Sequence, residues 1–246
     1  MKYIERTYRL LHRQEDLAFF QVLIKETDLD IGVLRSKLTP ELVAGTRRQV
    51  MSVRSQLEQY IACDVTFVKT LKPYKPVPGA PEIVKLMADA ATRAGIGPMS
   101  AVAGTIAQYV GGYLVKRSRE VIVENGGDIY IRSERMRKIG VFAGPSPFTN
   151  RLALEIQPHQ TPLGVCTSSG TVGHSLSLGR ADAVVVLAPS AALADAVATA
   201  AGNLVQEEDD LQAAVDFALG IKSIIGAVAI KNDKLAAAGN IKLAPM

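Results

Sequence analysis

The sequence predicts an α+β fold, in which an antiparallel sheet has helices packed against it. Most of the apolar, β-branched runs are joined by short turns, and the strongest turn is Asn125-Gly126-Gly127-Asp128, which lies between two such runs. The helical patterns are grouped between sets of strands and do not follow each strand in turn. A doubly wound parallel sheet would need a helix after nearly every strand, so that architecture is disfavoured.

The composition is that of an ordinary globular protein of 246 residues, long enough for one large domain or two small ones. The net charge of +4 and the isoelectric point near 9.0 indicate a mild basic excess, which is compatible with an anionic ligand. A nucleic-acid-binding protein would gather its basic residues on one stripe and place aromatic residues among them. The sequence lacks such a stripe, so nucleic acid is not expected as a partner.

Two cysteines, Cys63 and Cys166, are too few for a disulfide framework, and no Cys-x-x-Cys spacing indicates a zinc site. Both lie among apolar residues and are expected to be buried. The first residues carry charges where a signal peptide needs an apolar run. Apolar stretches such as 224–230 fall far short of the roughly 20 residues that span a bilayer. We therefore expect a cytoplasmic protein that has no membrane partner.

The N-terminal part is expected to begin with two strands within residues 2–25, separated by a polar turn at 14–16. A helix should begin at Thr39-Pro40-Glu41, which combines an N-cap residue, a proline in the first turn and an acid near the positive end of the helix dipole. Helical spacing gives this helix a stripe facing the core, formed by Val50, Val53, Leu57, Tyr60 and Ile61. Four prolines within 72–81 then predict an extended connector.

Two helices are predicted next, over 81–94 and 100–116. The second helix is unusually rich in small residues: Ala101, Ala103, Gly104, Ala107, Gly111 and Gly112. A glycine inside a helix costs roughly 1 kcal/mol relative to alanine. We therefore expect a neighbouring element or a ligand to pack close against the backbone of this helix.

The remaining strands are predicted at 121–123 and 129–131, on either side of the glycine turn, and at 138–143, 152–157, 163–167 and 182–188. Ser190 should cap a helix that runs to about Gly202, and 209–219 should form a short helix. The acidic run 207–210 resembles a metal-binding cluster. We interpret it instead as the cap of that short helix, because negative charge is favourable at a helix N-terminus. Two further β-like runs, 225–231 and 240–243, complete the order.

Two polar side chains of the helix that follows Ser190, Asp195 and Thr199, lie four residues apart and therefore share one face, which Asn203 extends. A carboxylate and a hydroxyl are hard oxygen donors of the kind that Mg²⁺ takes together with waters and substrate phosphates. The opposite, core-facing side is expected to carry Leu193, Val197, Ala200 and Leu204. The alternative is a solvent-facing polar stripe on an amphipathic helix, and spacing alone does not exclude it.

A polar loop at 167–175 holds hydroxyls and glycines, so its backbone N–H groups could converge on an anion. The alternative is a plain polar loop. His174 in this loop is the best candidate for a general acid or base, since imidazole titrates near neutral pH, although it could equally serve only to hydrogen-bond the backbone. A serine-hydrolase triad is excluded, because no histidine follows residue 174 in the chain.

Taken in order, three motifs resemble those of the ApbE superfamily, the FAD:protein FMN transferases. The motifs are the Asn125-Gly126-Gly127-Asp128 turn, the Thr167-Ser168-Ser169-Gly170 loop and the run Ala194-Asp195-Ala196-Val197-Ala198-Thr199-Ala200. The resemblance covers roughly residues 95–231, and the last motif is the most specific of the three. It implies a T-fold-like antiparallel sheet and a single ApbE-like domain over 1–246, in which residues 1–75 form a divergent strand-hairpin and helix portion.

The resemblance also implies a site. Mg²⁺ would be held by Asp195, Thr199 and a backbone carbonyl near Ala103. FAD would be bound by Gly126, Gly127, Asp128, Ser168, Ser169 and Gly170. In the family's reaction, a threonine hydroxyl of an acceptor protein attacks the FMN-side phosphorus of FAD and AMP leaves, which requires a base for the hydroxyl proton. His174 is the histidine placed for that role.

The chain departs from the family's usual pattern. Only residues 175–181 stand where ApbE enzymes carry a longer segment with an Asp-Pro pair, and Gly104 replaces a usual lysine. We therefore expect a divergent, cytoplasmic ApbE-like group and keep two alternatives to a transferase. One is a protein that binds flavin or a nucleotide without transferring it. The other is a site for a purine- or pterin-like ligand at the subunit interface of a homo-oligomer.

Overall fold

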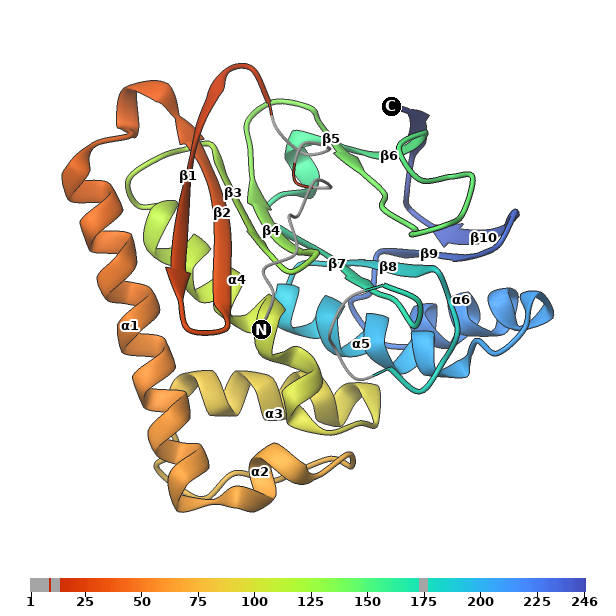
Figure 1. The fold of residues 1–246 in the computed structure, drawn as a ribbon, viewed down its shortest axis with the longest axis horizontal. Coiled ribbons are helices and arrows are strands. Elements are labelled where there is room, and N and C mark those ends of the chain that lie inside the picture. The colour runs from red at the N-terminus through yellow and green to blue at the C-terminus, as the bar shows by residue number, and fades with distance from the viewer. Residues whose placement is uncertain (1–8, 10–13, 173–176) are drawn as a thin grey trace.

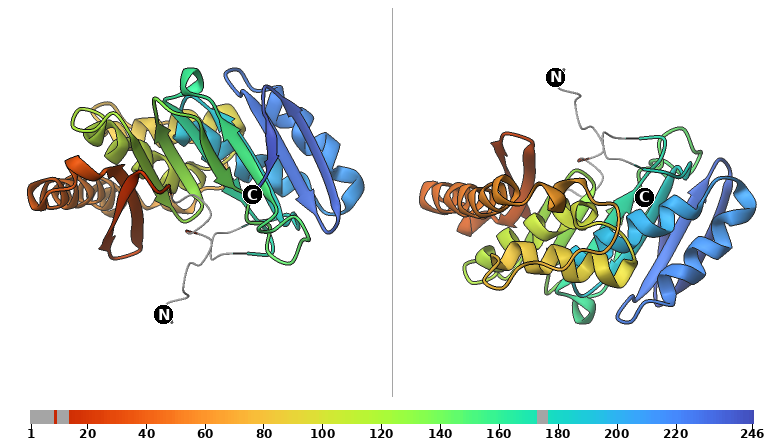
Figure 2. Two further views of the ribbon diagram at one scale, coloured as in Figure 1. Left: turned by 90° about the horizontal axis from the view of Figure 1, so that it is seen from above. Right: turned by 90° about the horizontal axis from the view of Figure 1, so that it is seen from below.

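The computed structural model of this chain describes residue 9, residues 14–172 and residues 177–246. Within these residues the chain forms three layers: helices, an eight-stranded antiparallel sheet and a three-stranded antiparallel sheet (Figure 1). Seen from one side the strands lie in front of the helices, and from the other side the helices cover the strands (Figure 2). The predicted α+β class, an antiparallel sheet with helices packed against it, is confirmed.

The large sheet has the strand order β1-β2-β3-β4-β7-β8-β9-β10, and every neighbouring pair is antiparallel. Its strands are β1 (Leu17–Ile24), β2 (Thr27–Leu34), β3 (Val121–Asn125), β4 (Asp128–Arg132), β7 (Leu163–Ser168), β8 (Ala183–Ala188), β9 (Gly226–Lys231) and β10 (Lys234–Gly239). The small sheet has the order β11-β6-β5, formed by β5 (Arg137–Gly140), β6 (Leu152–Ile156) and β11 (Leu243–Pro245).

Six α-helices occur in the described part of the chain: α1 (Pro40–Cys63), α2 (Val65–Lys69), α3 (Glu82–Ala94), α4 (Val102–Leu114), α5 (Ala191–Leu204) and α6 (Leu211–Leu219). Short 3₁₀ turns lie at Arg35–Lys37, Pro98–Ala101, Pro158–Gln160 and Glu208–Asp210. The predicted caps are confirmed, because the side chains of Thr39 and Ser190 accept hydrogen bonds from Leu42 N and Leu193 N. No described helix has both the length and the apolar character that crossing a lipid bilayer requires.

The core is divided by the large sheet. In β8, Val184 and Val186 pack with the helices, whereas Val185 and Leu187 pack with the small sheet. This strand is buried on both faces, which explains why it reads as a continuous apolar run and not as an alternating one. The three-layer arrangement therefore follows from which strands have two apolar faces.

Several elements differ from the sequence prediction. Strands β2 and β10 and helix α2 were not predicted, and most of the strand expected before residue 14 lies outside the described residues. Strand β2 escapes notice because Asp28 and Asp30 interrupt its apolar pattern, and aspartate is rare in strands. Cys166 is buried as expected, but Cys63 is exposed, so its predicted burial is wrong. The last strand begins at Leu243 and only touches the predicted 240–243 run.

Candidate functional site

Three chain segments that carry the recognised motifs meet on the helix side of the large sheet. The backbone N–H of Gly104 in α4 donates to Oδ2 of Asp195 in α5, at 2.8 Å. The backbone N–H of Thr167 at the end of β7 donates to Oδ1 of Asp128 in β4, at 3.2 Å. The Asn125 amide donates to the carbonyl of Ala103, at 3.1 Å. The glycine turn, the Thr-Ser-Ser-Gly segment and the alanine-rich helix therefore form one region.

Asp195 is buried, with 7% of its surface exposed, because α5 is enclosed by the sheet and by other helices. Helices α4 and α5 can approach at this point only because residue 104 is a glycine. A Cβ built there would lie 2.4 Å from the carbonyl oxygen of Ala191 and 2.7 Å from Cβ of Asp195. The expectation that a neighbouring element packs against the glycine-rich helix is confirmed, and that element is α5.

A second buried carboxyl group, that of Asp128, lies close enough to Asp195 for the charge of Asp195 to affect its ionisation. Burial raises the pKa of Asp195 to about 7, against the opposing effect of the Gly104 N–H. Burial and then the negative charge of Asp195 raise the pKa of Asp128 well above its ordinary value. Two buried carboxyl groups of this kind are poorly compensated by the surrounding donors, and a cation would relieve that imbalance.

Cys166 lies beside these carboxyl groups on β7. Its Sγ atom lies 3.3 Å from the carbonyl oxygen of Ala191, to which the thiol donates. Burial, followed by the charges of Asp128 and Asp195, raises the pKa of the Cys166 thiol well above its ordinary value. The thiol therefore stays protonated and contributes packing to the site, not a nucleophile.

Thr199 is half-buried and lies one helical turn beyond Asp195. Two helical threonines that are fully buried, Thr46 and Thr105, donate their hydroxyls to the carbonyl four residues earlier. The hydroxyl of Thr199 makes no hydrogen bond within the described part of the chain. It is therefore available to a ligand, whereas the carbonyl of Ala103 accepts the bond from Asn125 and lies within α4, where carbonyls also accept the N–H four residues on.

The two glycines of the β3–β4 turn both have positive φ, 68° at Gly126 and 103° at Gly127, as a two-residue type I′ hairpin requires. Gly126 is exposed, and a Cβ built on it would meet no atom within 4 Å. The N–H of Gly127 donates to Oε1 of Glu124, at 2.8 Å. A ligand can therefore approach the backbone at Gly126, whereas the donor of Gly127 is already used.

The loop after β7 is held in part by its own polar groups. Ser169 Oγ accepts hydrogen bonds from the N–H groups of Thr171 and Val172, and the N–H of Gly170 donates to the carbonyl of Ala181. The hydroxyl of Ser168 instead faces α5, since its Oγ would lie 3.4 Å from a Cβ built on Gly202. His174, the predicted base, lies outside the described residues.

Asn203 joins the far end of this loop to α5. Its Oδ1 accepts a hydrogen bond from the N–H of Leu178, at 2.9 Å, and a Cβ on Gly179 would overlap the carbonyl of Gly202. Ser168 and residues 178–179 therefore lie beside the C-terminal end of α5, which the sequence alone leaves undetermined. The Oδ1 atom of Asn203 is therefore occupied by the segment that precedes β8.

Helix α5 differs from the amphipathic helix expected from the sequence. Leu204 was placed on the core side but is 46% exposed, and Asp195 is buried where a polar stripe facing solvent was the alternative. Most of the residues between 191 and 202 are buried, so the helix has almost no solvent face. Alanine hides this in the sequence, because its small side chain gives a weak periodic signal whether it is buried or exposed.

The donor set suits a hard cation and not a zinc site. No group of three or more histidine, cysteine or acidic side chains forms a metal centre in the described ranges. The oxygen atoms in this region are instead the carboxylate of Asp195 and the hydroxyl of Thr199, with the carbonyl of Ala103 and the carboxyl group of Asp128 nearby. Few carboxylates with room left for water and phosphate oxygens are typical of Mg²⁺. The residues therefore fit the predicted ion.

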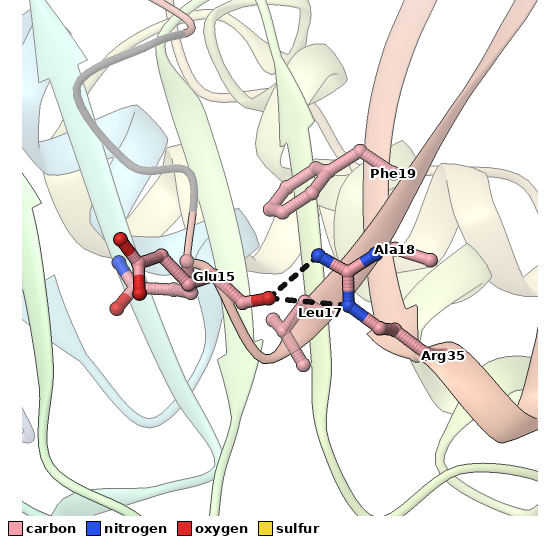
Figure 3. A pocket seen from close by; sticks show the side chains of 6 residues that line it. Glu15, Leu17, Ala18, Phe19 and Arg35 are labelled. Carbon is pink, nitrogen blue, oxygen red and sulfur yellow. Dashed lines mark hydrogen bonds between the residues drawn. The ribbon is translucent and has the colours of Figure 1, made fainter.

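A surface pocket lies elsewhere, at the outer edge of the large sheet (Figure 3). Its lining residues are Gln14, Glu15, Leu17, Ala18, Phe19 and Arg35. The guanidinium group of Arg35 points across it to the Glu15 carbonyl, which accepts hydrogen bonds of 3.2 and 2.6 Å from Nε and Nη2 (Figure 3). This pocket contains none of the candidate site residues, and its one cation is already bound to the backbone.

Sequence reasoning missed two residues that support the glycine turn: Glu124, which binds Gly127, and Arg9, which binds Glu124. Glu124 stands directly before the recognised turn, so its position was a usable signal, but a glutamate within an apolar strand reads as an interruption. Arg9 gives no local signal. It lies 115 residues from Glu124 in the chain, and only the fold brings the two together.

Comparison with known proteins gives one family and one fold. The family model described as "AbpE bacteria" matches residues 9–235. The UPF0280 protein of Methanocella arvoryzae is 44% identical over 193 residues, which cover 78% of each chain. The UPF0280 protein MK0206 of Methanopyrus kandleri is 46% identical over 202 residues, covering 81% of this chain and 78% of the relative.

Two solved structures share the fold at low sequence identity. The flavinyl transferase ApbE of Pseudomonas stutzeri, in its apo form, is 16% identical with a TM-score of 0.54, covering 91% of this chain and 94% of its own. The ApbE protein of Thermotoga maritima is 13% identical with a TM-score of 0.52, covering 92% of this chain and 96% of its own. The resemblance expected from the three motifs is therefore confirmed at the level of the fold.

Proposed function

The chain belongs to the family described as AbpE bacteria, and from that premise we propose that it is a Mg²⁺-dependent flavin transferase-like enzyme. In the proposed reaction the hydroxyl oxygen of an acceptor protein bonds to the FMN-side phosphorus of FAD. The bridging P–O bond breaks, AMP leaves, and a base takes the hydroxyl proton. The observation that carries the proposal is the buried pair of Asp195 and Asp128 at the meeting point of the three motifs.

The chain's own residues would divide the work as follows. Asp195, Thr199 and the carbonyl of Ala103 would hold Mg²⁺, which, when bound, would neutralise the charge of the pyrophosphate. The open backbone at Gly126 admits a ligand without a side chain in the way. Ser168 lies beside the C-terminal end of α5 and would supply a loop hydroxyl. His174 remains the candidate base for the acceptor hydroxyl.

A second function, flavin or nucleotide binding without transfer, is favoured by one observation. Ser169 and Gly170 use polar groups to hold their own loop and the neighbouring Ala181, so fewer loop donors remain for the phosphates of a reacting dinucleotide. A protein that only binds would need less stabilisation of the charge that develops on the leaving AMP. The two functions differ in turnover, and not in binding.

The test measures FAD binding by fluorescence anisotropy and AMP release by chromatography, each with and without Mg²⁺. The variants are Asp195→Asn, which keeps the side-chain shape, and the matched control Asp89→Asn, an exposed aspartate on α3. A transferase should bind FAD in the presence of Mg²⁺ and release AMP, and only Asp195→Asn should lose both.

Each other outcome has a defined meaning. FAD binding without AMP release, when a pool of candidate acceptor peptides is supplied, would support the second function. If the wild-type protein binds neither FAD nor FMN under either condition, the proposed function is wrong.

A further inference from the structure

Glu124 is a completely buried glutamate in β3, and Asn125 separates it from the two glycines of the turn. Alternation along β3 places Val123 with the helices and Ile122 with the small sheet. Glu124 therefore lies on the face of the sheet away from the Asp195 side of the candidate site. A buried carboxylate needs strong partners, and these partners indicate its role.

The two carboxylate oxygens of Glu124 have different partners. Oε1 accepts the hydrogen bond from the N–H of Gly127, at 2.8 Å. Oε2 accepts one from Nε of Arg9, at 2.7 Å. One side chain therefore connects the backbone of the turn to a residue from the N-terminal segment.

Arg9 also binds Asp28 of β2. Its Nη1 donates to Oδ1 of Asp28, at 3.1 Å, and its Nη2 donates to the carbonyl of the same residue, at 2.6 Å. Arg9 is 7% exposed and Asp28 3% exposed, so this arrangement is shielded from water and from screening salt. The rigid fork of the guanidinium group fixes Glu124 in position relative to β2.

The bond from Gly127 also decides which donor of the turn faces a ligand. The Gly127 N–H is used by Glu124, and the exposed Gly126 N–H has no partner among the described residues. Without Glu124, the two glycines could adopt other conformations easily, since glycine has almost no steric preference between them. The turn would then lose the geometry in which Gly126 is presented.

We infer that Glu124, held by Arg9, is a positioning residue that fixes the Gly126–Gly127 turn in the conformation that receives the flavin nucleotide. The inference rests on the proposed function for the identity of the ligand. It assigns to the N-terminal segment, through Arg9, a part in forming the site. Neither residue touches the ligand, and both act through the backbone of Gly127.

The chain contains a matched control for this role. Glu120 lies immediately before β3, at the end of the β3–β4 hairpin that is remote from the glycine turn. It is 3% exposed and pairs with Nη2 of Arg137 at 2.7 Å. It has the same chemistry as Glu124 but contacts Ser133 and Glu134 and not the turn. A purely structural role would make the loss of either glutamate equivalent.

The experiment compares Glu124→Gln with Glu120→Gln. Glutamine has one acceptor oxygen where Glu124 uses two, so either Gly127 or Arg9 loses its bond. Three quantities are measured: the FAD dissociation constant, hydrogen exchange at the Gly127 amide in the protein without ligand, and the midpoint of thermal unfolding. We expect Glu124→Gln to weaken FAD binding about tenfold and to speed exchange at Gly127 by about tenfold, as the loss of one charge-assisted hydrogen bond predicts.

Glu120→Gln should lower the unfolding midpoint by a comparable amount yet change FAD affinity and Gly127 exchange by less than about twofold, since additivity holds for distant groups. Equal effects of the two variants on FAD affinity would overturn the inference. So would an unchanged exchange rate at Gly127 in Glu124→Gln. If that variant does not fold, Arg9→Lys replaces it, because lysine keeps the charge but cannot bridge Glu124 and Asp28 as a planar fork.

Failure of the inference is distinguishable from failure of the proposed function. If the wild-type protein binds no flavin, the proposed function is wrong and the flavin part of the inference is overturned with it. Exchange at Gly127 is measured without ligand and still decides whether Glu124 fixes the turn. If flavin binds and Gly127 exchange does not respond to Glu124→Gln, the proposed function stands and the positioning role is wrong.

Discussion

The backbone N–H of Gly104 donates a hydrogen bond to the carboxylate of Asp195, and this bond joins helices α4 and α5 at the candidate site. The donor belongs to the first turn of α4, where N–H groups have no partner within the helix. Asp195 supplies that partner from a buried position. The absence of a side chain at residue 104 is what allows the two helices to approach closely enough.

Replacing Gly104 with alanine should therefore destabilise the protein. The new Cβ would overlap the Ala191 carbonyl and Cβ of Asp195, and neither can move far, so a loss of about 1–3 kcal/mol in the free energy of unfolding is expected. Urea denaturation measures it. Gly112→Ala in the same helix is the control: its Cβ meets nothing within 4 Å, so that variant should gain up to about 1 kcal/mol. Equal changes in the two variants would contradict the close approach.

Asp195→Asn should make the metal-free protein more stable at neutral pH. The raised pKa of Asp195, about 7, means that the folded state holds its proton where the unfolded state has lost it. The contribution of this proton to the free energy of unfolding of the wild type is fully present below pH 4. It is lost as the pH rises towards 7, by at most about 1.4 kcal/mol per pH unit.

The advantage of the Asp195→Asn variant should therefore grow between pH 4 and pH 7 and then level off. Urea denaturation in EDTA at pH 4.5, 6.0 and 7.5 measures this difference. A constant difference between the variant and the wild type across that range would show that burial does not raise the pKa of this carboxyl group.

Glu120 should show the opposite pH dependence. Burial opposes ionisation of its carboxyl group, but hydrogen bonds from Arg137 and then Ser133 outweigh burial and lower the pKa of Glu120. Its contribution is then present above the ordinary glutamate pKa and is lost as the pH falls through the lowered value. Glu120→Gln should cost about 1–3 kcal/mol at pH 7, since the buried Arg137 loses one of its two acidic partners and keeps Asp16, and clearly less at pH 3. Chemical denaturation of both proteins at the two pH values checks this.

Thr199 offers a direct test of the metal assignment. Thr199→Val removes the hydroxyl while keeping the shape, and should weaken Mg²⁺-dependent FAD binding by about tenfold, as the loss of one oxygen ligand implies. Thr199→Ser keeps the hydroxyl and should stay within about twofold of the wild type. Titration of Mg²⁺ at constant FAD gives the apparent affinity. If valine and serine behave alike, the hydroxyl does not hold the ion.

The predictable parts of this protein are those with local causes. The Thr39 and Ser190 caps and the Gly126–Gly127 hairpin each follow from residues within one turn of chain, and all occur where expected. The position of Asp195 was also predicted, by its place in a motif. Its burial was not, because burial of α5 depends on α4 and on the sheet, which are distant in the chain.

The same distinction explains what was missed. Strand β2 carries Asp28 and Asp30, both buried, and the burial of Asp28 makes sense only once Arg9 is seen to neutralise its charge. Glu124 looked like a break in a strand and is instead a partner of Gly127. Charged residues inside strands cannot be interpreted until their partners are known, and those partners lie in other parts of the sequence.

The place of β2 in the large sheet also has a consequence for how the chain is made. Its neighbours in the sheet are β1, which a two-residue turn joins to it, and β3, whose Asn125 pairs with Leu29 although about 95 residues lie between them in the chain. During synthesis one edge of the β1–β2 hairpin therefore stays unpaired while those residues emerge from the ribosome. An unpaired strand edge can hydrogen-bond to other nascent chains. Asp28 and Asp30 lie on this unpaired strand, and their charges oppose its pairing with other chains until β3 has been synthesised.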